Sequence, residues 1–357
     1  MTDHTIKVLV ADDSPVARML LVHLLESDPQ IHVIGAVSNG QAALEFLHEN
    51  QANVVLMDIQ MPGMDGFEAT RLIMESRPVP IVICTATTDP REIATTFRSM
   101  EAGAVACVEK PVAQEHADFA LLAANLLQTV KLMSEVKVVR RWPQLRAASI
   151  ALPASRPEET RAASIKLIGI GASTGGPPVL QTILGSLPKD FPIPVLIVQH
   201  IARGFLPGLV EWLNQTTGWQ VHVASYGTTT LPGHAYLAPD DFHMGVGKSG
   251  RIVLTHEQPH NGLRPAVSYL FRSLAEAWGP SAIGVLLSGM GKDGSAELKL
   301  MKDSGATTIA QDRESSVVHG MPGEAIELGG ATHVLPADKI ADILITLVNH
   351  VTPDERT

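Results

Sequence analysis

The 357-residue sequence has few aromatic residues and almost no cysteine, and both shortages limit what the chain can be. Only 4% of its residues are Phe, Trp or Tyr, so its cores must be built from aliphatic side chains and methionine. Both cysteines, Cys84 and Cys107, fall in apolar, strand-like runs. Two such thiols cannot supply the disulfide framework of a small secreted domain. We therefore expect two reduced core cysteines in a cytoplasmic protein.

Basic charge and long apolar runs are also scarce. The 27 Lys and Arg residues are outnumbered by 37 Asp and Glu, which gives a formal net charge of −10. Nucleic-acid binding needs a basic surface, so we expect no nucleic-acid partner. No apolar stretch is long enough to cross a bilayer, and the N-terminus lacks the basic start of a signal peptide. We expect no membrane insertion.

The first third of the chain alternates short apolar runs with amphipathic stretches, which is typical of parallel α/β domains. Ser14 is placed to cap a helix that begins at Pro15. The strand-like runs cover residues 6–11, 33–37, 54–57, 81–85 and 104–108. We predict a five-stranded, doubly wound parallel sheet within residues 1–125, with functional groups at the carboxyl ends of its strands.

Residues 126–163 are rich in Arg, Ala, Ser and Pro, and they are predicted to form a linker whose early part extends the preceding helix. A second α/β domain with a mainly parallel sheet is predicted over residues 164–357. Its strand-like runs cover residues 166–169, 195–199, 282–287 and 307–310.

Polar side chains end or follow four strands of the first predicted sheet. They are Asp12, Asp13, Asp58, Thr85 and Lys110. The carboxyl ends of parallel strands share one edge, so we expect these groups in one pocket. Clustered carboxylates suit Mg²⁺, which offsets their mutual repulsion. One carboxylate could then attack a phosphoryl group while the metal and the lysine neutralise charge.

The segments ADDS, MDIQMPGMDG, CTAT and EKP resemble the receiver domain of two-component response regulators. The resemblance implies a histidine kinase as phosphodonor. It also implies a role for each residue of the pocket: Asp58 as the phosphoacceptor, Asp12, Asp13 and Asp58 as Mg²⁺ ligands, and Thr85 and Lys110 as contacts of the phosphoryl group. The alternative, that these residues only cap strand ends, explains each of them but not the set.

One position departs from the receiver pattern. Many receivers carry an aromatic residue three positions before the lysine, and this residue moves with the threonine on phosphorylation. Here that position is Cys107, so the usual threonine–aromatic coupling is in doubt.

The segment KLIGIGASTGGPPVL predicts a strand, a glycine-rich turn and a helix start. A dinucleotide fingerprint would need a third glycine where Thr174 stands, and an acidic residue where the next strand instead ends in Gln199 and His200. The other interpretation is a nucleophile elbow, Gly-x-Ser-x-Gly, which exposes the Ser173 hydroxyl beside helix N-terminal amides. We favour the elbow.

Two further strand-end residues supply what a nucleophilic serine needs. His200 ends the apolar strand VLIVQH and is the best-placed base. Asp293, in the glycine-dense turn GMGKDG, is the candidate that orients it. Each alone could be a turn residue, but the three together have complementary chemistry. Their order, Ser then His then Asp, differs from that of α/β-hydrolases, so we expect another fold.

The second domain resembles the catalytic domain of the chemotaxis protein-glutamate methylesterases. The matching segments are GASTGG, IVQHI, YLAPDDFHM, LLSGMGKDG and TIAQDRESSVVHGMP. The resemblance implies an esterase step without a cofactor. It assigns Ser173 as nucleophile, His200 as general base, Asp293 as orienting carboxylate, and Thr174 and Met290 as donors of oxyanion-binding amides.

The two resemblances together predict phosphorylation-activated hydrolysis of glutamyl γ-methyl esters on methylated chemoreceptors, with deamidation of receptor glutamines by the same chemistry. The alternative is a receiver-controlled binding module with a non-catalytic second domain, which the intact Ser173, His200 and Asp293 disfavour. The acidic balance and the lack of a terminal helix-turn-helix pattern disfavour a transcription factor. The sequence alone poorly distinguishes a hydrolase of small esters from a receptor methylesterase.

Overall fold

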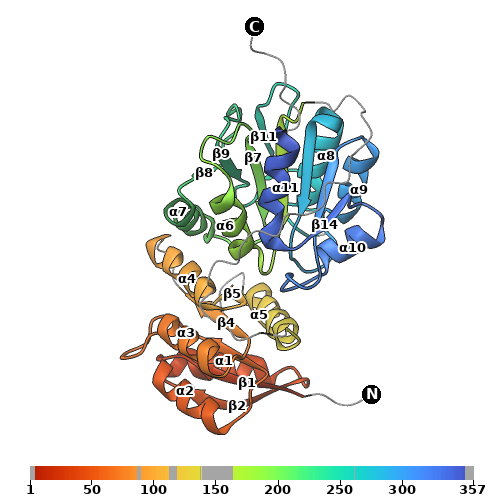
Figure 1. Ribbon diagram of the computed structural model, residues 1–357. Helices are drawn as coiled ribbons and strands as arrows, with labels where there is room; N and C mark the ends of the chain where they lie inside the picture. The colour runs from red at the N-terminus through yellow and green to blue at the C-terminus, as the bar shows by residue number, and fades with distance from the viewer. Residues whose placement is uncertain are drawn as a thin grey trace. The chain divides into compact units, whose positions relative to one another are not determined.

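The computed structural model describes residues 5–86, 90–111, 119–136, 138, 164–260 and 262–349. The chain divides into two compact units, Met1–Pro153 and Ala154–Thr357 (Figure 1). Most of the predicted linker, residues 137 and 139–163, lies outside the described residues. Helix α5 (Phe119–Ser134) occupies the first part of that segment. The exact domain bounds stay a prediction.

The first unit contains a five-stranded sheet in the order β2-β1-β3-β4-β5, and all of its strand pairs are parallel, as predicted. Continuous apolar strands of this kind need helices on both faces of the sheet. The strands are β1 (Ile6–Ala11), β2 (Ile31–Val37), β3 (Val54–Met57), β4 (Ile81–Thr85) and β5 (Ala106–Glu109).

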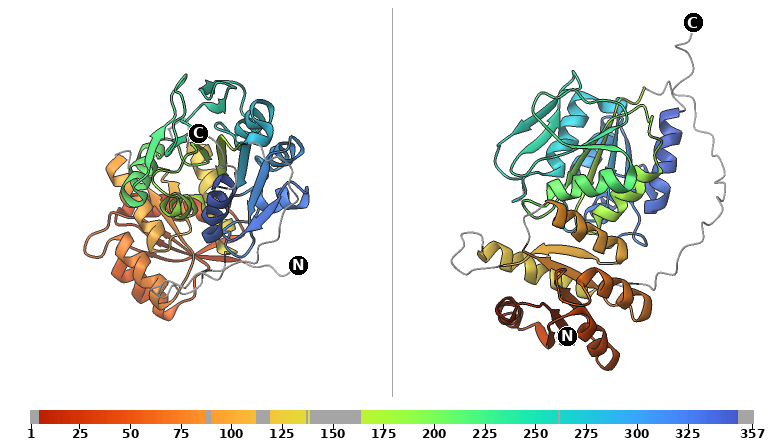
Figure 2. Two further views of the ribbon diagram at one scale, coloured as in Figure 1. Left: turned by 45° about the horizontal axis from the view of Figure 1, so that its top comes forward. Right: turned by 90° about the vertical axis from the view of Figure 1, so that its left-hand side faces the viewer.

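Helices cover both faces of this sheet (Figures 1 and 2). Helix α1 (Pro15–Glu26) packs with α5 on one face. The other face carries α2 (Gly40–Glu49), α3 (Gly66–Ser76) and α4 (Pro90–Ala102). Helix α1 begins as predicted, because the Ser14 hydroxyl accepts the Ala17 N–H at 3.3 Å. In this doubly wound arrangement the ends of the strands meet at the carboxyl edge of the sheet.

The second unit is built on a seven-stranded sheet in the order β14-β13-β12-β6-β7-β9-β8, with parallel pairing throughout. A separate antiparallel hairpin pairs β10 (His243–Val246) with β11 (Ile252–Thr255). The strands of the main sheet are β6 (Leu167–Ala172), β7 (Val195–Gln199), β8 (Gln220–Val223), β9 (His234–Leu237), β12 (Ala282–Leu286), β13 (Thr307–Gln311) and β14 (His333–Leu335).

Helices again lie on both faces (Figure 1). One face carries α6 (Gly176–Ser186), α7 (Leu206–Thr217) and α11 (Ala337–Asn349). The other carries α8 (Val267–Ala277), α9 (Ser295–Asp303) and α10 (Met321–Glu327), and a 3₁₀ turn (Gly279–Ser281) leads from α8 into β12. Strands β12, β6 and β7 are neighbours, so the turns that follow them share one edge of the sheet. No helix of the described residues is long and apolar enough to cross a membrane.

Candidate active site and phosphorylation site

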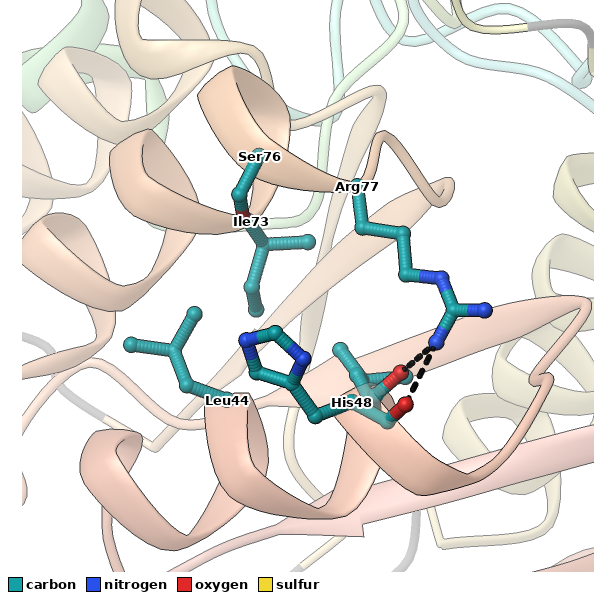
Figure 3. Close-up of a pocket in the computed structure, with 6 residues that line it drawn as sticks. Leu44, His48, Ile73, Ser76 and Arg77 are labelled. Atoms are coloured by element: carbon teal, nitrogen blue, oxygen red, sulfur yellow. Dashed lines mark hydrogen bonds between the residues drawn. The ribbon is translucent and has the colours of Figure 1, made fainter.

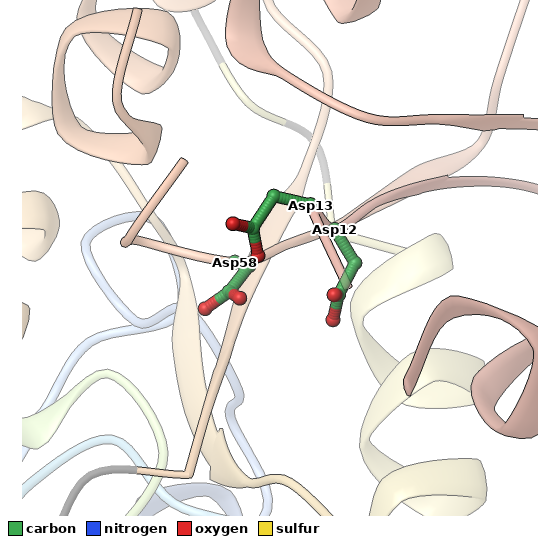
Figure 4. Close-up of side chains that lie close together, drawn as sticks. All are labelled: Asp12, Asp13 and Asp58. Carbon is green, nitrogen blue, oxygen red and sulfur yellow. The ribbon is translucent and has the colours of Figure 1, made fainter. Parts of the chain in front are cut away.

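Three aspartates meet at the carboxyl edge of the first sheet. Asp12 and Asp13 follow β1, Asp58 follows β3, and one carboxylate oxygen from each lies within 4.8 Å of the others (Figure 4). Asp12 and Asp58 are buried, and Asp13 is exposed. In the described part of the chain no other three His, Cys, Asp or Glu side chains gather this closely. Hard oxygen donors in this number fit a divalent cation such as Mg²⁺.

Lys110 and Thr85 complete the pocket. The Lys110 Nζ lies 2.8 Å from Asp12 Oδ2 and 2.7 Å from Asp58 Oδ2. Burial opposes the charge of Lys110, but the two carboxylates outweigh it and raise the lysine pKa. Burial raises the pKa of Asp58 in spite of the nearby ammonium. The Thr85 carbonyl accepts the Lys110 N–H at 2.8 Å, so all five predicted residues lie at one edge.

The two cysteines of this unit are free thiols. Burial raises the pKa of Cys84 and of Cys107 above the usual range. The thiolate is the nucleophilic form, so neither residue is a candidate nucleophile. Cys107 lies on β5 and pairs with Ile83 of β4, which puts a small thiol where many receivers carry a ring.

Ser173 follows the last residue of β6 in a turn that is held on both sides. Its N–H donates to the Ser288 carbonyl at 3.0 Å, and its own carbonyl accepts the Gly176 N–H at 2.8 Å. Gly175 has a φ of +79°, in the left-handed region that favours glycine. Helix α6 begins at the next residue. This is the strand–turn–helix geometry expected of a nucleophile elbow.

The partly buried His200 and the buried Asp293 form a pair beside this turn. The His200 N–H donates to the Ala172 carbonyl at 2.9 Å, and its Nε2 lies 3.0 Å from Asp293 Oδ2. The Asp293 carboxylate also accepts the N–H groups of Val267 at 2.6 Å and Ser268 at 3.0 Å, the first residues of α8. Burial opposes the charge of Asp293, but His200 and these two N–H groups outweigh it and lower the pKa. Asp293 is therefore an ionised and firmly held carboxylate.

Ser173 and His200 are brought together through the backbone. The residues before them, Ala172 and Gln199, are register partners in neighbouring strands. Within the described residues, the Ser173 hydroxyl makes no hydrogen bond to the His200 ring. Catalytic hydrogen bonds are often long in free enzymes and shorten when substrate binds.

The turn after β12 brings Met290 close to the serine. A Cβ placed on Gly289 would lie 2.8 Å from Ser173 Cβ, so the backbone that leads into Met290 packs against Ser173. In the described part of the chain, the N–H groups of Thr174 and Met290 donate no hydrogen bond. Two N–H groups without acceptors, one directly after Ser173 and one directly after a residue that packs against it, are suited to binding an oxyanion.

The sequence did not identify Ser288, whose side chain forms hydrogen bonds that hold the elbow in place. Its hydroxyl donates to the Thr174 carbonyl at 2.8 Å and accepts the Val318 N–H at 2.9 Å. Its N–H donates to Gln311 Oε1 at 2.8 Å. A serine in LLSGMG has no distinctive spacing, so only the folded contacts reveal this role.

A separate cavity of about 350 Å³ lies between α2 and α3 (Figure 3). One guanidinium nitrogen of Arg77 donates to the carbonyls of Leu47 and His48 and so closes the end of α2. Helices α2 and α3 end where β3 and β4 begin, so the cavity lies at the sheet edge opposite Asp58. It belongs to neither site. Its lining residues are Leu44, Leu47, His48, Ile73, Ser76 and Arg77.

Two family models match the chain in the order that the fold shows. The response regulator receiver domain matches residues 8–121, and CheB methylesterase matches residues 168–344. A Nitrosospira multiformis protein named protein-glutamate methylesterase/protein-glutamine glutaminase is 52% identical over 344 residues, which are 96% of this chain and 97% of that protein. The chain belongs to the CheB methylesterase family.

Other CheB relatives agree with this assignment. A Geobacter metallireducens protein with the same name, numbered 4, is 52% identical over 96% of this chain and 99% of its own length. The crystal structure of the Thermotoga maritima CheB methylesterase catalytic domain is 43% identical, with a TM-score of 0.50. It covers 52% of this chain and 100% of that chain. The predictions of a receiver, a parallel α/β fold and a methylesterase-type hydrolase are confirmed.

Proposed function

We propose that this CheB family member hydrolyses glutamyl γ-methyl esters on methylated chemoreceptors under the control of phosphorylation at Asp58, and that it deamidates receptor glutamines. The pairing of His200 with the buried Asp293 carboxylate beside the Ser173 elbow carries this proposal. Burying an ionised carboxylate is costly, and a non-catalytic binding module has no use for it at this position. The names of the relatives support the substrate class.

The chemistry is acyl transfer through a serine ester. The Ser173 hydroxyl attacks the γ-carbonyl carbon and gives its proton to His200. Because Nε2 lies 3.0 Å from Asp293 Oδ2, Nδ1 is the ring nitrogen left to take that proton. The amides of Thr174 and Met290 stabilise the oxyanion. The C–O bond breaks, methanol leaves with the proton from His200, and water then cleaves the acyl-enzyme. From a glutamine, ammonia leaves instead.

The receiver supplies the control. Asp58 accepts a phosphoryl group from a histidine kinase, and Thr85 and Lys110 contact that group. Asp12, Asp13 and Asp58 are the residues that would hold Mg²⁺, and a bound Mg²⁺ neutralises charge on phosphoryl oxygens.

The direct test uses purified protein and receptor-containing membranes that carry radiolabelled methyl esters. Released methanol is counted with and without a small phosphodonor. Deamidation is followed by mass spectrometry of receptor peptides. We expect methanol release that the phosphodonor increases; no release from receptors that another CheB protein demethylates would refute the proposed substrate.

Asp293→Asn should lower kcat/KM by roughly 10²- to 10⁴-fold, and His200→Ala should lower it further. The asparagine cannot stabilise the protonated His200 ring, and its NH₂ group would face N–H groups of α8 or the ring. Methanol release is the readout. The matched control is Asp303→Asn, an exposed carboxylate on α9, which should leave the rate unchanged. Full activity of Asp293→Asn would contradict the assignment of Asp293 as the carboxylate that orients His200.

A fragment of residues 164–357 should hydrolyse the ester without a phosphodonor and more quickly than the unphosphorylated full-length chain. It contains Ser173, His200 and Asp293, and the Thermotoga maritima relative was solved as a catalytic domain alone. Addition of a phosphodonor should not change its rate. If the fragment is no faster than the resting full-length protein, the receiver acts by positive activation and not by restraint.

A further inference from the structure

We propose that Gln199 is a positioning residue for this reaction: its buried side-chain amide fixes the nucleophile and the base relative to one another. The inference rests on the proposed function, because it takes Ser173 and His200 as the nucleophile and the base. It concerns a residue that touches neither reacting atom.

Gln199 ends β7 and faces the turn that carries the serine. It is 5% exposed, and its register partner is Ala172, the last residue of β6. Its Nε2 donates to the Ser173 carbonyl at 2.8 Å and to the His200 carbonyl at 2.9 Å. One nitrogen thus uses both of its hydrogens on the backbones of two proposed catalytic residues.

The chemistry of the two partners requires an amide in this orientation. Both are carbonyl oxygens, so a rotated amide would direct its own oxygen at two acceptors. A glutamate carboxylate would do the same and add a buried charge. Glutamine meets these requirements, because it is neutral, has this length and carries two hydrogens on its amide nitrogen.

This arrangement has a structural cost that points to function. Gln199 Oε1 is buried, and among the described residues it has no hydrogen-bond partner. A Cβ on Gly176 would lie 2.3 Å from that oxygen and 2.8 Å from Ala172 Cβ, so glycine at this position leaves room for the amide. A buried acceptor without a partner is unfavourable for stability. Positioning of the catalytic turns accounts for this cost.

Strand register alone does not fix the proposed catalytic groups. Ser173 and His200 each lie one residue beyond the end of a strand, where the chain turns away from the sheet. The Gln199 amide joins the two turns at their carbonyls, so neither turn can shift without the other. A misplacement of about 1 Å at a reacting centre can cost about 100-fold in rate.

The first test is Gln199→Met, which keeps the side-chain length and removes both donors. We expect kcat for receptor demethylation to fall about 10- to 100-fold and KM to change less than about twofold. The second readout is the rate at which phenylmethanesulfonyl fluoride labels Ser173, in which an Oγ–S bond forms and fluoride leaves. That rate should fall in parallel.

The labelling reaction separates failure of this inference from failure of the proposed function. If wild-type Ser173 is not labelled, the proposed nucleophile is wrong. If wild type is labelled and Gln199→Met reacts at the same rate, the role of Gln199 is wrong.

Thr308→Val is the matched control for loss of a buried hydrogen bond. Thr308 is buried on β13, donates to the Gly330 carbonyl at 2.6 Å, and is separated from β6 by β12. We expect it to lower Tm without changing kcat. If both variants lose Tm and kcat to the same extent, Gln199 is only a structural residue and the inference falls.

Gln199→Glu supplies a readout, the pH dependence of kcat/KM, that should not change if Gln199 has only a structural role. Burial opposite two carbonyls raises the pKa of the new carboxyl, and only its protonated form can donate a hydrogen bond. The ratio of variant to wild-type kcat/KM should therefore rise as the pH falls. A ratio that does not change with pH overturns the inference. This test remains decisive if Gln199→Met fails to fold.

Discussion

Ser173→Ala should reduce methyl ester hydrolysis by roughly 10⁴- to 10⁶-fold, because the loss of a serine nucleophile removes the acyl-enzyme route altogether. The remaining rate would come from water that is activated by His200 and aided by the oxyanion-binding amides. Radiolabelled methanol release under saturating substrate measures the loss. Labelling by phenylmethanesulfonyl fluoride should disappear at the same time.

The variant should fold normally, which makes the kinetic result clear. The elbow is held by backbone bonds from the Ser173 N–H and carbonyl, and alanine keeps both. Ser304→Ala, which removes a hydroxyl bonded to the Leu300 carbonyl on α9, is the matched control and should retain full activity. Activity of Ser173→Ala within about tenfold of wild type would remove this serine from the mechanism.

The central strands could be predicted closely because their burial leaves a simple sequence pattern. Strands β1, β3, β4 and β7 have the predicted bounds, since strands that are covered on both faces are continuous apolar runs. The outer strands of the second sheet, the edge strands β8 and β14 and the adjacent β9, were not predicted. They are three or four residues long and carry His or Gln, so their pattern does not differ from that of a loop.

The candidate sites were predictable as far as strand order allows. Ser173, His200 and Asp293 each follow an apolar strand, and parallel strands bring such residues to one edge. The hydrogen bonds that position these residues were not predictable, because they form between groups that come close together only in the folded chain. No spacing indicates that Asp293 accepts the first N–H groups of α8, or that the Gln199 amide reaches two carbonyls.

Asp58→Asn should abolish phosphorylation by acetyl phosphate and with it all stimulation of the esterase, while basal hydrolysis stays at the wild-type rate. The amide is no substitute for a nucleophilic carboxylate, and the proposed esterase residues all lie in the other unit. Mass spectrometry of the treated protein is the readout, and EDTA should prevent the reaction in wild type. Asp65→Asn is the control, because asparagine caps α3 as well as the exposed aspartate does.

The same substitution should not destabilise the receiver. Burial raises the pKa of Asp58 in the folded chain, so its ionised form opposes folding at pH values above that pKa, and a neutral asparagine removes this penalty. Lys110 keeps its second partner, Asp12, at 2.8 Å. Without Mg²⁺ we therefore expect Tm at neutral pH to equal or exceed that of wild type. A clear drop in Tm would show that the Lys110–Asp58 pair stabilises the fold, and lost stimulation could then reflect an unfolded receiver. A phosphoryl group found on another residue would refute Asp58 as the acceptor.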